Sequence, residues 1–379
     1  MRAYLDWNAT APPHASALAA MSEAARDAWG NPSSVHAEGR AARRWVERAR
    51  EAVATLTGKD ARDVLFTSGG TEANNLAIVS AMERPGKLLV SRIEHPSVTR
   101  VAERYERDGR VRWLRVLGSG AIDLDDLRAA LDEGDVSTLA ICAVSAEMGI
   151  LQPLDTAIGL AQARGVWVHV DAVQAFGRVQ SASILARRAD TVSLAAHKMR
   201  GPKGIGALAA LPGARIVPIV VGGAQERGLR PGTVDPIACA GLCAAVSRAE
   251  ESAAAYARLA PLRDRLEAAL IEMGAERNGD GLTLSGGEAA RAPHIASLAF
   301  PSFSGPELVA ALDLEGVAVS AGPACSAGTM EPSKALTMLY GEDRARRTIR
   351  VSLGEETSSD EIDFALGVFR EVLQRSART

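Results

Sequence analysis

The sequence contains few lysines, which makes each of them informative. Of its 43 Lys and Arg residues only five are lysine, namely Lys59, Lys87, Lys198, Lys203 and Lys334. Arginine therefore supplies nearly all of the generic positive charge. A guanidinium cannot form an imine with a carbonyl compound, whereas an amine that can lose its proton does so. Each lysine is thus a candidate for amine chemistry.

Long apolar runs, a signal-like N-terminus and a disulfide framework are also missing. No run of 18 apolar residues occurs, so the sequence predicts no membrane span. Residues 1–8 lack the charged and then apolar pattern of a secretory signal. The net charge of -3 argues against a nucleic acid or a membrane surface as the primary ligand. We expect a cytoplasmic protein whose cysteines are free thiols: Cys142, Cys239, Cys243 and Cys325.

No metal site is expected. Cys239 and Cys243 are four residues apart in an apolar helical stretch without a histidine partner, so packing is the simpler interpretation. His169 alternates with valines, which favours a buried position on a strand. His95 follows an expected strand and is expected near the ligand-binding edge of the sheet.

Short apolar strands alternate with helical segments between about residues 60 and 210. This pattern is typical of an α/β fold with a mostly parallel central sheet and helices on both faces. A long helix at about 246–273 leads into a smaller α+β region, whose last helix has a capping-box pair in Ser358 and Glu361. We expect a large domain at 13–250 and a small domain formed by 1–12 and 251–379. The expected strands of the central sheet are 63–67, 87–90, 111–116, 139–144, 166–170 and 191–196.

Chemically suitable residues directly follow three of these strands, where parallel sheets bind ligands. Gly70-Thr71 could offer helix N-terminal amides to an anion, or form only a tight turn. Asp171 could bind a metal, a ribose or a protonated pyridine nitrogen, or only cap a helix. Lys198 lies among small residues that could desolvate its amine and lower its pKa, or could be an ordinary loop lysine.

Cys325 has a different sequence context from the other thiols. It lies within Ser320–Thr329, where most residues are small, whereas Cys142 and Cys239 lie in apolar runs. This context suits an exposed nucleophilic thiol, and it also suits a loop thiol without a role.

Together these segments resemble the cysteine desulfurases, class V members of the aminotransferase-fold enzymes that use pyridoxal 5'-phosphate (PLP). The resemblance runs from Tyr4 to Gly354, nearly the whole chain. The spacing from Cys325 to Glu331-Pro332-Ser333 is similar to that of the long-loop type. The other specific segments are Asn31–His36, Thr67–Asn75, Glu94-His95, His169–Gln174, His197–Gly204 and Gly222–Thr233.

The resemblance implies a role for each matched residue. Lys198 is expected to hold PLP, His95 to stack on the ring and shuttle protons, and Arg350 to bind the substrate carboxylate. Cys325 is expected to take the sulfur of L-cysteine, which leaves L-alanine and a persulfide on Cys325. The expected cofactor-binding residues are Gly70, Thr71 and His197 at the phosphate, Asp171 at the ring nitrogen, Gln174 at the phenolic oxygen, Lys198, and Thr233 at the phosphate of a neighbouring subunit.

The role of Thr233 at a neighbouring subunit implies a homodimer. The persulfide implies a sulfur-acceptor protein, such as an iron–sulfur scaffold, or a route to thiolated tRNA.

Two positions depart from the family pattern. Ala146 replaces an asparagine that contacts the cofactor and substrate, and Ala195 replaces a hydroxyl residue at the phosphate. A lost hydrogen bond to a charged group costs about 1.5–3 kcal/mol, which predicts weaker binding of PLP or substrate unless a neighbour such as Ser145 compensates.

Two other functions stay open on the sequence alone. One is a related PLP lyase, for example one that acts on selenocysteine. The other is an inactive PLP-binding scaffold, which only Ala146 and Ala195 suggest. The presence of Cys325 argues against a simple aminotransferase, because that reaction needs no such thiol.

Overall fold

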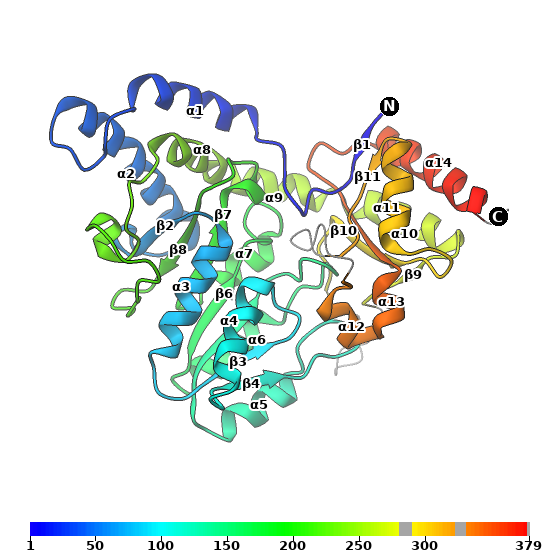
Figure 1. Cartoon of the computed structure of the whole chain (residues 1–379), viewed down its shortest axis with the longest axis horizontal. Helices are drawn as coiled ribbons and strands as arrows, with labels where there is room; N and C mark the ends of the chain where they lie inside the picture. Colours follow the sequence, from blue (N-terminus) through cyan, green and yellow to red (C-terminus); the bar gives the residue numbers. More distant parts are fainter. Residues whose placement is uncertain (280–289, 323–330, 377–379) are drawn as a thin grey trace.

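The computed structural model describes residues 1–279, 290–322 and 331–376 (Figure 1). A seven-stranded sheet forms its centre. The strand β8 (Gly206–Ala210) runs antiparallel to both neighbours, and the other strands are mutually parallel. The sequence-based prediction of a mostly parallel sheet is therefore confirmed. The strand order is β2 (Val64–Thr67), β8, β7 (Thr191–Ala195), β6 (Trp167–Asp171), β5 (Val136–Cys142), β3 (Lys87–Ser91) and β4 (Val111–Leu114).

The sheet is buried on both faces, which explains its nearly continuous apolar strands. Val168 and Val170 of β6 are 0% exposed, and so is His169 between them. The prediction of a buried His169 is thus confirmed. The helices of this part are α1 (Ala15–Asp27), α2 (Ala37–Thr57), α3 (Gly70–Met82), α4 (Pro96–Glu106), α5 (Leu124–Asp132), α6 (Leu154–Gln162), α7 (Gln180–Ala186) and α8 (Pro236–Ser247).

A second group of elements joins the N-terminus to the C-terminal third of the chain (Figure 1). Its sheet places β10 (Ile295–Ala299) between β12 (Thr348–Ser352) and β9 (Glu276–Arg277), all antiparallel. The first strand, β1 (Ala3–Tyr4), pairs with β11 (Val317–Ala318). The helices here are α9 (Ala249–Ala257), α10 (Ala260–Glu272), α11 (Gly305–Leu314), α12 (Lys334–Tyr340), α13 (Glu342–Arg346) and α14 (Ser359–Ser376).

The prediction of a single helix at about 246–273 is wrong. Three helices, α8, α9 and α10, cover this stretch. Pro261 lies in the first turn of α10, where its missing N–H costs nothing, whereas it would break the interior of a continuous helix. The capping box of α14 is confirmed, since Ser358 N donates to Glu361 Oε2 and Glu361 N to Ser358 Oγ. The sequence also predicts a short strand at 282–284, which lies outside the described residues.

The segment that follows β1 connects the two groups of elements. Asp6 forms a bridge with Ser352 of β12, and the next residues cross to the carboxyl edge of the central sheet. There Ala11 N donates to the carbonyl of His197, just after β7. The N-terminal residues therefore belong to the wall of the site described below. Among the described residues, no helix combines the length and the apolar character needed to cross a membrane.

Candidate active site

A cavity of about 350 Å³ opens at the carboxyl edge of the central sheet. It gathers eight residues that the sequence singles out, from five separate segments of the chain. These are Gly70, Thr71, His95, Asp171, Gln174, His197, Lys198 and Arg350.

Lys198 lies one short turn beyond β7, in the 3-10 segment Ala196–Met199. Its Nζ donates to the carbonyl of Asn8 and, at 2.8 Å, to that of Ala9. Burial, followed by the charges of Arg178 and Arg350, lowers the pKa of Lys198 to about 7. Near neutral pH a large fraction of this amine is therefore unprotonated and able to act as a nucleophile.

Asp171 ends β6 and is held by a buried chain of hydrogen bonds. Asn74 of α3 donates through Nδ2 to Asp171 Oδ2 at 2.7 Å, and its Oδ1 lies 3.1 Å from His169 Nε2. Burial lowers the pKa of His169 to about 4, so the ring is neutral. Since Asn74 Oδ1 can only accept, His169 Nε2 carries the proton. Asp171 is thus fixed as an acceptor at the cavity.

His95 is the N-cap of α4, and Pro96 follows as the first helical residue. The Ser97 amide donates to His95 Nδ1 at 3.1 Å, which makes Nε2 the protonated nitrogen of the neutral ring. Burial lowers the pKa of His95. The helix cap thus fixes both the position and the tautomer of a ring at the cavity wall.

The N-terminus of α3 forms another wall of the cavity. Its N-cap, Gly69, has φ of 153° and provides no side-chain cap, so first-turn amides stay available to a ligand. A Cβ on Gly70 would lie 2.6 Å from Val173 Cγ2, so only glycine fits without displacing that side chain. His197 faces the same cavity, and burial together with Lys198 lowers the pKa of His197 to about 3. It is therefore a neutral hydrogen-bonding group.

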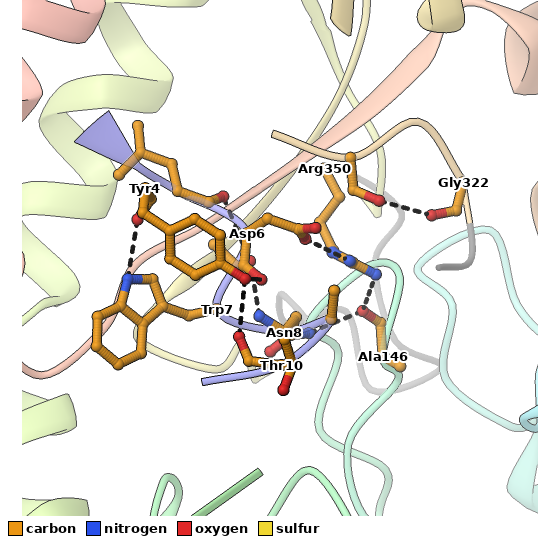
Figure 2. A network of polar contacts seen from close by, with 12 residues as sticks. Tyr4, Asp6, Trp7, Asn8, Thr10, Ala146, Gly322 and Arg350 are labelled. Atoms are coloured by element: carbon orange, nitrogen blue, oxygen red, sulfur yellow. Dashed lines mark hydrogen bonds and ion pairs between the residues drawn. The ribbon is translucent and has the colours of Figure 1, made fainter. Parts of the chain in front are cut away.

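Arg350 of β12 also lines the cavity, and Figure 2 shows its guanidinium beside Asp6 and Ala146. Its NH2 donates to Asp6 Oδ1 at 2.8 Å, and its NH1 donates to the Ala146 carbonyl at 3.3 Å. Its Nε has no hydrogen-bond partner among the described residues and is buried. Two nitrogens of the guanidinium are thus hydrogen-bonded, and the third has a donor left that can bind a carboxylate.

Glu94 and Cys142 form a buried pair next to Asp171. Burial, followed by the charge of Asp171, raises the pKa of Glu94 to about 8. Its Oε1 accepts from Ser91 Oγ at 3.0 Å. Burial and the nearby carboxyls also raise the pKa of the Cys142 thiol. Both groups are therefore uncharged at neutral pH.

Among the described residues, one predicted site residue, Thr233, does not line the cavity. Thr233 is exposed in the segment before α8. Cys325 lies outside the described residues, although Ser333 a few residues later caps α12. Cys239 and Cys243 pack within and beside the core, and no cluster of metal ligands occurs in the described part of the chain.

Asp6, Asn8, Asn74 and Glu94 have no predicted role from the sequence, yet each contacts a predicted site residue or lines the cavity. Asn74 could have been found, because it is one helical turn after Gly70 and shares its face. Nothing local signals Asp6 or Asn8, since their partners lie more than a hundred residues away.

The residues present fit PLP. The cavity offers a nucleophilic amine at Lys198, a carboxylate at Asp171, and open amides beside Gly70 for a phosphate. Each of the three reactive parts of PLP, its aldehyde, ring nitrogen and phosphate, thus has a matching group.

The comparisons with known proteins agree with this geometry. The family model described as aminotransferase class-V matches residues 3–364. A cysteine desulfurase IscS of Dictyoglomus turgidum is 34% identical, over 98% of this chain and 94% of its own. One of Klebsiella pneumoniae is 36% identical, over 98% and 93%.

Two solved structures are similar over most of both chains. A NifS-like protein has a TM-score of 0.88 and 30% identity, covering 99% of this chain and 100% of its own. SspA in complex with cysteine has a TM-score of 0.78 and 29% identity, covering 94% and 100%. From the family match and these full-length relatives it follows that the chain belongs to the class V aminotransferase family, and within it to the cysteine desulfurases.

Proposed function

We propose that this protein is a PLP-dependent cysteine desulfurase. The observation that carries the proposal is the meeting of Lys198, Asp171 and Arg350 at one cavity, with an amine whose pKa is lowered to about 7. Two relatives that match over nearly their full length are named cysteine desulfurases. The overall reaction converts L-cysteine and the Cys325 thiol into L-alanine and a Cys325 persulfide. One C–S bond breaks and one S–S bond forms, so no external oxidant or reductant is needed.

Bound PLP would supply an electron sink for bond changes at the carbon atoms of the amino acid. Lys198 would hold the cofactor through its amine and, once displaced, move a proton with Nζ. Asp171 would accept from the ring nitrogen and keep it protonated. His95 would lie against the ring, with its Nε2 proton available for transfer.

The phosphate would lie at the N-terminus of α3, near Gly70, Thr71 and His197. The geometry of Arg350 supports its proposed role as the clamp of the substrate carboxylate, because its buried Nε has no partner among the residues that the structure describes. Gln174 would donate to the phenolic oxygen of PLP.

Several finer assignments complete the proposal. We propose a homodimer in which the exposed Thr233 reaches the phosphate of the neighbouring subunit. Cys325 would pass its sulfur to an acceptor protein, such as an iron–sulfur scaffold, through a loop of the long type. A cytoplasmic location would keep this thiol reduced, in line with Cys142, Cys239 and Cys243, which are free.

The test is reconstitution of the full chain with PLP. We expect a visible absorbance band that changes on addition of L-cysteine, with release of L-alanine. Lys198→Ala should abolish the band that depends on the covalent link. A band without alanine would contradict the desulfurase function, and a faster reaction with L-selenocysteine than with L-cysteine would favour the related lyase instead.

A further inference from the structure

Arg178 is a fully buried arginine directly behind the cavity wall. It lies between β6 and α7 and is 0% exposed. Its Nε donates to the Lys198 carbonyl at 2.9 Å, and its NH2 donates to the Trp7 carbonyl at 2.8 Å. Its NH1 donates at 2.7 Å to both Asn8 Oδ1 and Gln174 Oε1. The guanidinium therefore joins the N-terminal segment to two cavity residues.

All of these acceptors are uncharged oxygens. Within the described ranges Arg178 forms no ion pair, and its guanidinium carbon lies 5.6 Å from the centroid of the Tyr256 ring. Burial lowers the pKa of Arg178, but a guanidinium with four oxygen acceptors stays a cation. A buried charge without a counter-charge costs stability, which suggests that it serves the site rather than the core.

The contact with Gln174 decides which way its amide points. A guanidinium has only donors, so the atom of Gln174 that faces Arg178 must be Oε1. The Nε2 atom then donates to the Asn8 carbonyl at 3.2 Å and keeps one hydrogen for a ligand. Gln174 can thus only donate toward the cavity that it lines.

The same guanidinium acts on the amine of Lys198. Two cations, Arg178 and Arg350, disfavour the ammonium form, and two carboxylates, Asp6 and Asp171, favour it. Of the other titratable groups that line the cavity, His95 and His197 have lowered pKa values, so both rings are neutral at pH 7. Glu94, Glu147 and Cys142 have raised pKa values because they are buried. Of the charged neighbours, Arg178 has the largest effect on Lys198 after burial itself.

We propose that Arg178 is a positioning residue of the cofactor site, which acts on Lys198 through its charge and on Gln174 through its hydrogen bond. It touches neither substrate nor cofactor. It keeps the Lys198 amine reactive before PLP arrives, and it presents the Gln174 N–H to the phenolic oxygen. This role rests on the proposed function, because it assigns both residues to a PLP site.

The first test measures the Lys198 amine in the full chain freed of PLP. Pulse acylation at a series of pH values, read by peptide mass spectrometry, gives the pH at which Lys198 is half reactive. In Arg178→Gln we expect this midpoint to rise by about one pH unit, because a neighbouring cation is lost. Arg178→Lys keeps a cation and should stay close to the unsubstituted protein. An unchanged midpoint in folded Arg178→Gln would overturn the charge effect.

Arg263→Gln is the matched control for the loss of a buried guanidinium. Arg263 is 7% exposed and donates to the Ala292 carbonyl, and it does not line the cavity. We expect this variant to lose a similar amount of thermal stability without moving the Lys198 midpoint. A midpoint that moved equally in both variants would show a general structural effect and contradict the proposal.

The second test uses the PLP dissociation constants of Arg178→Gln, Gln174→Ala and the double variant, measured at about pH 9, where the Lys198 amine is largely unprotonated in all of them. If Arg178 acts by orienting Gln174, the double variant should bind PLP about as weakly as Gln174→Ala alone. Independent, additive losses would overturn the orienting effect. Neither test needs turnover of L-cysteine, so a protein that binds PLP but fails to release alanine would refute the desulfurase function without refuting this role.

Discussion

The carboxylate of Asp6 lies 2.8 Å from the guanidinium of Arg350, although the two residues come from opposite ends of the chain (Figure 2). Asp6 forms an isolated bridge with Ser352, which lies two residues after Arg350 on β12. The ion pair is therefore set by the backbone before any ligand binds. Asp6 holds one nitrogen of Arg350 and leaves Nε for a substrate.

We predict that Asp6→Asn raises KM for L-cysteine about tenfold, with a smaller change in kcat, since a charge-assisted hydrogen bond that orients the guanidinium is lost. Asp313→Asn, which removes an exposed pair with Arg2, should leave both constants unchanged. Steady-state alanine formation measures both. A lower KM in Asp6→Asn would mean that Asp6 competes with the substrate carboxylate instead of orienting its clamp.

Glu94 should make the protein less stable as pH rises. Its pKa is about 8 in the folded chain and near 4.5 in the unfolded one, so the folded state binds more protons between these values. The free energy of unfolding therefore falls between about pH 4.5 and pH 8 from this group. Glu94→Gln should remove that fall. The melting temperature of the variant minus that of the unsubstituted protein should therefore increase from pH 5 to pH 8. Glu23→Gln, at an exposed position, serves as control; a pH-independent difference would contradict the prediction.

Lys198 should have the opposite effect in the PLP-free chain. Its pKa is about 7 when folded and near 10.5 when unfolded, so the unfolded state binds more protons between these values. The cost of burying the ammonium is fully present below pH 7 and disappears as pH rises toward 10.5. Lys198→Gln should therefore stabilise the PLP-free protein at pH 6 and much less at pH 10. The exposed Lys203→Gln should show no such trend.

Ala195→Ser should tighten PLP binding. The Ala195 side chain lines the cavity, 3.7 Å from where a Cβ on Gly70 would lie, so a hydroxyl there would face the expected phosphate position. One added hydrogen bond to a charged group is worth about 1.5–3 kcal/mol, which corresponds to about tenfold or more in the dissociation constant. Equilibrium dialysis of PLP measures it, with the exposed Ala163→Ser as control. Unchanged affinity would show that the hydroxyl missing from Ala195 does not limit binding.

The sequence predicts most strands of the central sheet because they are short apolar runs. Asp171 and Lys198 come at the carboxyl ends of two of these strands, so the sequence also places them at one edge of the sheet. It predicts the site residues that follow strands for the same reason. It does not predict β8, whose Gly-Ala-rich segment carries little strand signal. It also assigns one helix to 246–273, where helical periodicity continues across the real breaks at Arg248 and Arg258.

The supporting residues could not be predicted from local patterns. Arg178 looks like an ordinary surface arginine in a chain rich in arginine, and only the fold reveals that it is buried behind Lys198. Asn8 contacts Ala146, Arg178 and Lys198, all distant in sequence. The contact with Ala146 uses the backbone carbonyl, so it survives the replacement of the family's asparagine.

The central claim is that Cys325 receives the sulfur of L-cysteine at a PLP site built on Lys198. The most direct measurement mixes the PLP-loaded protein with a single equivalent of L-cysteine without oxygen, and then determines L-alanine and the mass of the peptide that contains Cys325. We predict one L-alanine for each sulfur atom added to Cys325, and neither product in Cys325→Ser. Alanine formed at the same rate by Cys325→Ser, or sulfur found on Cys142, Cys239 or Cys243 instead, would contradict the account.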